Sequence, residues 1–219
     1  MTASGAGKGA IVVVDYGMGN LRSVWQALAH VAAGRQVLVT SDPAEVAAAE
    51  RVVVPGQGAM PDCMREIASR GLRTAVLEAA RNKPFLGICI GQQMLFEHSD
   101  EGDVPGLGLI AGGVHRFPAE KMIDATGNKL KVPHMGWNEV RQAREHALWK
   151  GIADDARFYF VHSYFVEPLD AAAIVGTTNY GIPFTSAVAR DNIFAIQCHP
   201  EKSAVDGLAL LANFVAWKP

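Results

Sequence analysis

Cys89 lies between two glycines, in a segment whose spacing suits a nucleophile. Residues 84–91 read PFLGICIG, so a short apolar run ends at Cys89, with Gly87 two positions before it and Gly91 two positions after it. Small neighbours at these positions let a strand turn sharply into a helix and hold the central side chain above the edge of a sheet. A helix that starts directly after Cys89 would favour the thiolate, the nucleophilic form of cysteine. An isolated cysteine is more often a buried apolar residue, but the paired glycines favour a nucleophile here.

The segment QCHPE at residues 197–201 offers a base for that nucleophile. It follows an apolar run at 193–196, so His199 and Glu201 come at the carboxyl end of a predicted strand, where α/β sheets hold their ligands. A cysteine nucleophile needs a base that takes and returns a proton, and the base needs an acceptor that fixes its tautomer. Separately, the two residues could be a capping histidine and a surface glutamate. Together, on either side of Pro200, they indicate a catalytic pair.

A third candidate segment is PGQG at residues 55–58, again directly after a predicted strand. Gly56 and Gly58 leave backbone N–H groups free to converge on one point, as an oxyanion hole requires, and each such donor is worth roughly 3 kcal/mol of barrier. Taken alone, the segment would be interpreted as an ordinary glycine-rich turn. Three strand ends that meet at one edge of a sheet favour a common site.

The elements that must position these segments alternate between strand and helix through the first hundred residues. Apolar β-branched runs predict strands, and apolar residues at helical spacing predict helices. The predicted strands cover residues 10–14, 36–40, 51–55 and 85–88, and the predicted helices cover 21–33, a short segment from 42, 61–82 with a break near Gly71, and 90–98. Asn20 and Asp42 are predicted N-caps, and Glu45 would complete a capping box with Asp42. This alternation predicts crossover units and a parallel sheet.

Shorter β-rich runs predominate after residue 102. Strands are predicted at residues 157–161, 172–177, 185–190 and 193–198, with a tight hairpin turn at 191–192. Ser203 is predicted to cap a final helix whose buried face carries Leu208, Leu211, Ala212 and Val215. The expected fold class is therefore α/β, with a mixed, largely parallel central sheet and helices on both faces. Residues 10–219 are expected to form a single domain after a disordered tail at 1–9.

Composition excludes several classes of partner and site. The chain has 219 residues, of which 49% are hydrophobic, and a formal net charge of -2, without a Lys/Arg block that would suit nucleic acid or an anionic membrane. No apolar run approaches the ~18 residues of a membrane span. Three scattered cysteines fit a reducing cytoplasm better than a disulfide framework or a zinc site. Neither a metal nor a cofactor is expected.

The segments PGQG, GICIGQQ and HPE, in this order and spacing, resemble the class I, or triad-type, glutamine amidotransferase family. The likeness extends from residue 10 to the final helix and implies a flavodoxin-like core. It also implies that Cys89 is the nucleophile, His199 the general base and then acid, and Glu201 the group that orients the histidine. Glutamine would be cleaved to glutamate and ammonia through a γ-glutamyl thioester. Gln92 departs from the hydrophobic residue common in the family, at a position expected to face the sheet or a partner.

The same resemblance implies which residues bind the substrate. Gly56, Gly58 and the amide of Ile90 would surround the oxyanion. Gln93, four residues after Cys89, would lie in the glutamine pocket. The backbone of residues Ser163, Tyr164 and Phe165 would help to hold the α-amino and carboxylate groups.

Three further segments, DYGMGNL, PHMGWNEV and YFVHSY, resemble the branch of the family that supplies glutaminase subunits to imidazole glycerol phosphate synthases. That likeness implies a heterodimer with a separate cyclase subunit, which takes ammonia directly because free ammonia in water becomes non-nucleophilic ammonium. It places Asn20, Trp137, Tyr159 and Lys202 at the subunit interface. Simpler interpretations are a core or interface aromatic for Trp137 and an exposed lysine for Lys202.

Three alternatives remain open from the sequence. The chain could be the amidotransferase component of another synthase, such as anthranilate synthase, which shares the triad without needing HMGWN. It could be a non-catalytic regulatory module, although such modules typically lose the nucleophile or the base. A thiol peptidase with the same elbow would leave the segments around Trp137 and Tyr159 unexplained.

Overall fold

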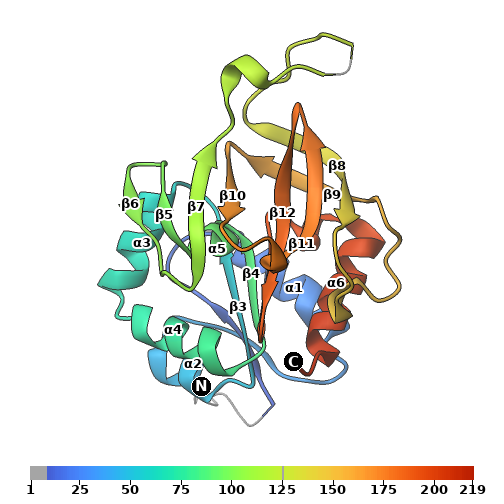
Figure 1. Ribbon diagram of the computed structural model, residues 1–219. Helices are drawn as coiled ribbons and strands as arrows, with labels where there is room; N and C mark the ends of the chain where they lie inside the picture. The colour runs from blue at the N-terminus through green and yellow to red at the C-terminus, as the bar shows by residue number, and fades with distance from the viewer. Residues whose placement is uncertain (1–8, 125) are drawn as a thin grey trace.

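The computed structural model describes residues 9–124 and 126–219 (Figure 1). The predicted tail at residues 1–9 therefore lies, apart from Gly9, outside the described residues. Among the helices of the described ranges, none has the length and the hydropathy needed to cross a lipid bilayer.

A parallel sheet forms the centre of the molecule, as the alternation of elements predicts. Its strands follow one another in the order β2-β1-β3-β4-β13, with every neighbouring pair parallel. Four of the five are buried along their whole length, because β-branched and apolar residues fill both faces of the sheet. This order is that of a flavodoxin-like sheet, in which ligands bind beyond the carboxyl ends of the strands. The strands are β1 Ile11–Val14, β2 Val37–Thr40, β3 Arg51–Gly56, β4 Phe85–Cys89 and β13 Ile193–Ile196.

Helices cover both faces of this sheet, as expected: α2, α3 and α4 lie on one side, and α1 and α6 on the other (Figure 1). The predicted break near Gly71 separates α3 from α4, and Gly71 has a φ of +69°. Asp42 caps α2 as predicted, accepting from the Ala44 N–H at 2.8 Å. The second half of the predicted capping box, a bond from the Asp42 N–H to the Glu45 side chain, does not form. The Asp42 N–H donates to Thr40 Oγ1 instead. The helices are α1 Leu21–Val31, α2 Pro43–Ala48, α3 Met60–Ser69, α4 Arg73–Asn82, α5 Ile90–Gln93 and α6 Ala204–Ala216.

An antiparallel half continues the sheet beyond β13 in the order β12-β10-β7, followed by β5 and β6. From β12 a branch of β11, β8 and β9 extends away. The hairpin predicted at residues 191–192 joins β12 to β13, with Asp191 at a φ of +51°. The strands are β5 Phe96–Ser99, β6 Val104–Pro105, β7 Ile110–Arg116, β8 His134–Gln142, β9 Ala156–His162, β10 Tyr164–Pro168, β11 Ile174–Tyr180 and β12 Ile182–Arg190. Single turns of 3-10 helix lie at η1 Ala119–Lys121, η2 Ala147–Trp149, η3 Ala171–Ala173 and η4 Pro200–Lys202.

The helix predicted over residues 90–98 is wrong in its length. α5 ends at Gln93 after about one turn, and the chain then enters β5. Tertiary pairing overrides local helical preference here, because Phe96 pairs with Ile110 of β7 and the Leu95 carbonyl accepts the N–H groups of Leu109 and Ile110. The helix that follows Cys89 is thus one turn long, with β5 taking the place of its expected second half.

Two helix caps and one buried face also differ from the prediction. Asn20 and Ser203 directly precede α1 and α6, but neither side chain forms a capping hydrogen bond. The Ser203 hydroxyl is already used, since it donates to the His199 carbonyl and accepts from the Tyr159 N–H. The predicted face of α6 is rotated: Leu208 and Ala212 are half-buried. The buried residues of α6 are Gly207, Leu210, Leu211, Phe214 and Val215.

Candidate active site

Cys89 lies at a sharp turn between β4 and α5, as the flanking glycines predict. Its φ of +56° and ψ of -111° are strained for a residue with a side chain, and such strain is typical of functional sites. A Cβ on Gly87 would come 2.6 Å from the Gly91 carbonyl oxygen, and a Cβ on Gly91 would overlap the carbonyl oxygen of Val54. Both glycines are therefore required by packing, and they allow α5 to fold back tightly over β3 and β4.

His199 and Glu201 lie at the carboxyl end of β13, the strand next to β4. His199 Nδ1 and Glu201 Oε1 are 2.9 Å apart, and both side chains are almost completely buried, with 3% and 1% exposure. Burial lowers the pKa of His199, but the neighbouring Cys89 and Glu201 outweigh it and raise the pKa to about 10. The pair therefore stabilises the imidazolium, the form that can protonate a leaving group.

The second ring nitrogen of His199, Nε2, is buried and has no hydrogen-bond partner among the residues that the structure describes. Cys89 is nevertheless the neighbour with the largest upward effect on the pKa of His199. The missing hydrogen bond does not separate the two residues functionally, because catalytic hydrogen bonds in a substrate-free site are commonly long and tighten when substrate binds. Nε2 is thus the nitrogen available for proton transfer.

A set of bonds from β9 fixes the turn that carries His199. The His199 N–H donates to the Tyr159 carbonyl at 2.8 Å, and the Tyr159 N–H donates to Ser203 Oγ at 3.0 Å. Ser203 Oγ in turn donates to the His199 carbonyl at 2.6 Å. A Cβ on Gly207 would overlap the Pro200 carbonyl, so Gly207 lets α6 pack closely beneath the same turn. The position of the base is therefore set by β9 and α6 together.

Two buried amides, bonded in series, lead to the nucleophile, and only Gln93 of the two was predicted from the sequence. Gln93 Nε2 donates to Gln197 Oε1 at 2.9 Å, and Gln197 Nε2 lies 3.5 Å from Cys89 Sγ. Gln197 stands two residues before His199, so its place at the same strand end was the signal that could have identified it. Gln92 faces the sheet, with its amide directed at the Ala195 carbonyl.

A cavity of about 220 Å³ opens in front of Cys89. Five of the predicted binding residues line it, namely Gly58, Ile90, Gln93, Ser163 and Tyr164. Gly56 does not line it but pairs with Cys89 in the sheet register, and a Cβ there would come 2.6 Å from Cβ of Ile90. The Phe165 ring is directed elsewhere and packs 5.0 Å from the ring of Phe117. The structure thus brings together most of the predicted pocket.

Glu101 also lines the cavity, and no sequence pattern indicated it. Its Oε2 accepts the Met60 N–H at 2.8 Å, which fixes the carboxylate at the start of α3. Among the described residues, no lysine or arginine lines this cavity. The pocket therefore presents a negative charge, together with uncharged amide and hydroxyl groups.

Three of the four predicted interface residues gather on one surface. Met135 and Trp137 of β8 pair with Val161 and Tyr159 of β9, and these four side chains form what we term the hairpin face. Met135 is 62% and Trp137 44% exposed. Trp137 and Tyr159 are in edge contact at 6.2 Å, and Lys202 Nζ lies 5.8 Å from the Tyr159 ring.

The hairpin face reaches the cavity, because Val161 lines it. Asn20 follows Gly19, which packs against the segment that pairs with Cys89: a Cβ on Gly19 would come 3.7 Å from Gly56 Cα. The predicted interface residues thus lie around the cavity rather than inside it.

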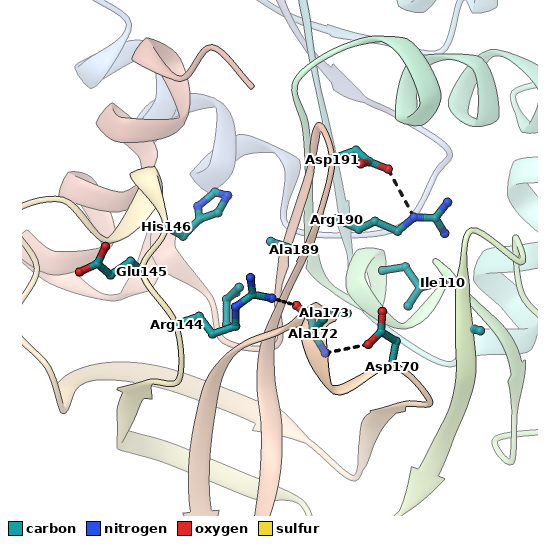
Figure 2. A pocket seen from close by; sticks show the side chains of 12 residues that line it. Ile110, Arg144, Glu145, His146, Asp170, Ala172, Ala173, Ala189, Arg190 and Asp191 are labelled. Carbon is teal, nitrogen blue, oxygen red and sulfur yellow. Dashed lines mark hydrogen bonds and ion pairs between the residues drawn. The ribbon is translucent and has the colours of Figure 1, made fainter.

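A larger cavity of about 490 Å³ lies at the opposite end of β13, by the Asp191 turn. Figure 2 shows that both of its arginines are already engaged: Arg190 pairs with Asp191, and Arg144 donates to the Ala172 carbonyl. Asp170 is engaged with the Ala172 N–H. The amino end of a parallel strand is also not where such sheets place their catalytic groups. The site at Cys89 is therefore the better candidate.

The comparisons with known proteins agree with this site. The family model described as "Glutamine amidotransferase class-I" matches residues 12–217. A protein of Dechloromonas aromatica (strain RCB), named imidazole glycerol phosphate synthase subunit HisH, is 74% identical over 209 residues, which cover 95% of this chain and 97% of the relative. A protein of the same name from Aromatoleum aromaticum is 68% identical and covers 95% and 99%.

Solved structures show the same fold at low identity. One described as a glutamine amidotransferase has a TM-score of 0.70 at 16% identity and covers 94% of this chain and 97% of its own. Another, described as PurLQS from Thermotoga maritima, has a TM-score of 0.68 at 18% identity, with 94% and 97% covered. The expected α/β fold with a mixed sheet is thereby confirmed.

Proposed function

Because the chain belongs to the class I glutamine amidotransferase family, we propose that it is the glutaminase subunit of an imidazole glycerol phosphate synthase. It hydrolyses glutamine to glutamate and ammonia, and it passes the ammonia to a separate cyclase subunit in histidine biosynthesis. The observation that carries the proposal is the buried arrangement of Cys89, His199 and Glu201 beside the cavity. The identity of 74% to a synthase subunit supports the choice of pathway. The chain acts as one domain, residues 10–219, in the cytoplasm.

The chemistry begins when the Cys89 thiolate attacks the side-chain carboxamide carbon of glutamine. Backbone N–H groups of Gly58 and Ile90, which line the cavity with Cys89, stabilise the oxyanion. His199 gives its Nε2 proton to the departing nitrogen, so the C–N bond breaks and ammonia leaves a thioester behind. Water then attacks the thioester while His199 takes one of its protons, which releases glutamate and restores the thiolate with the imidazolium.

Glu101 provides the recognition of the substrate's amino group. Glutamine carries an α-ammonium, and a carboxylate is its natural partner in a pocket without lysine or arginine among the described lining residues. The Met60 N–H holds this carboxylate in place, so its geometry is set before the substrate enters. The backbone around Ser163 and Tyr164 closes the other wall of the pocket.

The partner subunit binds the hairpin face. An exposed tryptophan and methionine beside the mouth of a catalytic cavity form an apolar surface of the kind found at protein interfaces. Asn20 and Lys202 flank this surface, and Lys202 and Tyr159 border the route that ammonia takes to the cyclase. Ammonia that crosses a covered interface stays unprotonated and therefore nucleophilic.

The experiment that tests the proposal compares ammonia release from glutamine by the purified chain with and without the cyclase. We expect weak glutaminase alone, strong stimulation by the cyclase, and co-purification as a heterodimer. Cys89→Ser should abolish glutamine-dependent product, while added ammonium salt still supports the cyclase. A chain that is fully active alone, or that stimulates only another synthase such as anthranilate synthase, would contradict the proposal.

A further inference from the structure

Two buried histidines, His134 of β8 and His162 of β9, face each other in the structure and take no part in the chemistry above. His134 Nδ1 lies 3.0 Å from His162 Nε2, and the residues are 3% and 6% exposed. Aromatic rings enclose the pair: Tyr180 stacks on His134 at 3.9 Å, and Phe117 lies 5.2 Å from His162. Burial lowers the pKa of His134 to about 4 and that of His162 to about 3, so both rings are neutral near pH 7.

The hydrogen-bond partners fix one tautomer for each ring. The Tyr164 carbonyl can only accept, so His162 Nδ1, at 2.8 Å from it, carries the proton. Neutral His162 must then accept at Nε2, and His134 must donate from Nδ1. His134 is left to accept at Nε2, where the Asn138 amide donates at 3.3 Å. All four groups are satisfied by this single arrangement.

The chain of bonds continues from Tyr164 to the nucleophile. The Tyr164 carbonyl also accepts from Gln93 Nε2 at 3.2 Å. Gln93 then donates to Gln197, which reaches Cys89 Sγ. An unbroken path of hydrogen bonds thus joins β8, the strand that carries Trp137, to the reacting sulfur.

This path positions groups and does not conduct protons. Two donors, His162 and Gln93, converge on the Tyr164 carbonyl, which has no proton to pass on. Gln93 Oε1 has no hydrogen-bond partner among the described residues. The bonds that the path does contain hold it rigid, because any member that moves leaves another buried polar group unpaired. The ordering of β8 is therefore linked to the orientation of the two amides beside Cys89.

We propose that His134 and His162 are positioning residues that couple the hairpin face to Cys89 through Tyr164, Gln93 and Gln197. The coupling rests on the proposed function, since it is through this face that the cyclase binds. A partner seated on β8 holds the pair in the arrangement that the free chain shows, and the pair holds the pocket wall and the amide that donates to the thiolate. The pair thus gives glutaminase stimulation a physical path that runs inside this chain.

The first test observes the tautomers in the unmodified protein. Nitrogen-15 NMR of the histidine side chains should show His134 and His162 both neutral and both protonated on Nδ1 at pH 7. Protonation on Nδ1 is the less common neutral tautomer of a histidine side chain in water, so its presence in both rings is specific. A ring protonated on Nε2, or a cationic ring, would overturn the proposal. The measurement needs neither glutamine nor a partner, so its outcome is independent of the proposed function.

The second test asks whether the path transmits an effect to Cys89. Gln197→Met should slow alkylation of Cys89 by iodoacetamide roughly tenfold, and His134→Leu several-fold, because each weakens a hydrogen bond that supports the thiolate. Combined, they should slow it by clearly less than the product of the two effects. His134→Asn keeps the donor to His162 and should stay within about threefold of wild type. Multiplicative effects would refute the coupling.

Thr178→Val serves as the matched control. Thr178 is buried on β11, and within the described part of the chain its hydroxyl has no hydrogen-bond partner. The substitution should leave Cys89 alkylation within about twofold of wild type, and an equal loss would show that any change in this core suffices. If His134→Leu does not fold, as judged by thermal unfolding, His134→Gln takes its place. It is then combined with Gln197→Met, and the combined effect is again compared with the product of the single effects.

Discussion

At the scale of single residues, Glu201 acts with Cys89 to keep the base His199 protonated. Its carboxylate, 2.9 Å from His199 Nδ1, helps to raise the pKa of His199, and Glu201→Gln removes that charge. The reactive state needs a protonated His199, so a lower pKa of this ring should shift the alkaline limb of kcat/KM to lower pH. We also expect kcat to fall roughly 10⁴-fold, as in triads whose orienting carboxylate is neutralised. A pH profile of glutaminase activity measures both.

Glu167→Gln is the control for this prediction, since the Glu167 carboxylate is 70% exposed and lies near His115, not near the site. It should leave the pH profile unchanged. An unshifted alkaline limb in Glu201→Gln would show that Glu201 does not govern the protonation of His199.

The residues that could be identified from the sequence are those whose role depends on their immediate neighbours in the chain. Cys89 is marked by Gly87 and Gly91, whose missing side chains the turn requires. Glu101 could not be found, because its place in the pocket depends on how β5 and β6 fold back toward α3 and not on its neighbours in sequence. Gln197 was within reach, but only the structure shows that its amide is directed at the sulfur.

At the scale of elements, the β8–β9 hairpin should make folding sensitive to acid. The unfolded chain protonates His134 and His162 near their ordinary pKa of about 6.5, whereas burial keeps the folded rings neutral until about pH 4 and 3. The fold therefore keeps its full stability above pH 6.5, and its free energy of unfolding falls as the pH drops from 6.5 toward 3. Urea unfolding between pH 7.5 and 5 should show a free energy of unfolding that falls with acid.

The matched variants separate this pair from other groups. His134→Leu should reduce the slope of the free energy of unfolding against pH. The variant lacks one of the two histidines that take up a proton only when the chain unfolds. His98→Gln changes a half-exposed histidine that contacts Asp103 and should leave the slope as in wild type. Equal slopes in wild type and His134→Leu would mean that this histidine does not stay neutral in the folded protein.

Elements were predictable where local pattern and tertiary structure agree. The buried strands β1, β3, β4 and β13 follow from their β-branched and apolar runs. The helix predicted after Cys89 was too long because the strand at Phe96 is fixed by its pairing with β7, which is decided by residues further along the chain. The prediction that Ser203 caps α6 was wrong for a similar reason, since the Tyr159 N–H of β9 donates to its hydroxyl.

At the scale of the whole molecule, the hairpin face should carry the energy of association with the cyclase. Trp137 is the large aromatic of this face, 44% exposed in the free chain, and buried aromatic anchors commonly dominate protein interfaces. We expect Trp137→Ala to raise the Kd for the cyclase roughly 30-fold and to lower the stimulation of glutaminase at a fixed cyclase concentration. Isothermal titration calorimetry of the two proteins measures the first effect.

The control for Trp137→Ala is a substitution of an exposed apolar residue far from the hairpin face. Leu169 is 79% exposed and lies beside Asp170, at the far cavity of Figure 2, so Leu169→Ser removes more exposed apolar surface at a remote place. It should leave both the Kd and the stimulation unchanged, and neither variant should change the thermal unfolding of the free chain, because neither side chain is in the core. If Leu169→Ser weakened the complex while Trp137→Ala did not, the partner would have to approach from the opposite end of the sheet. Ammonia would then have no covered path from Cys89, and the assignment of the hairpin face would be wrong.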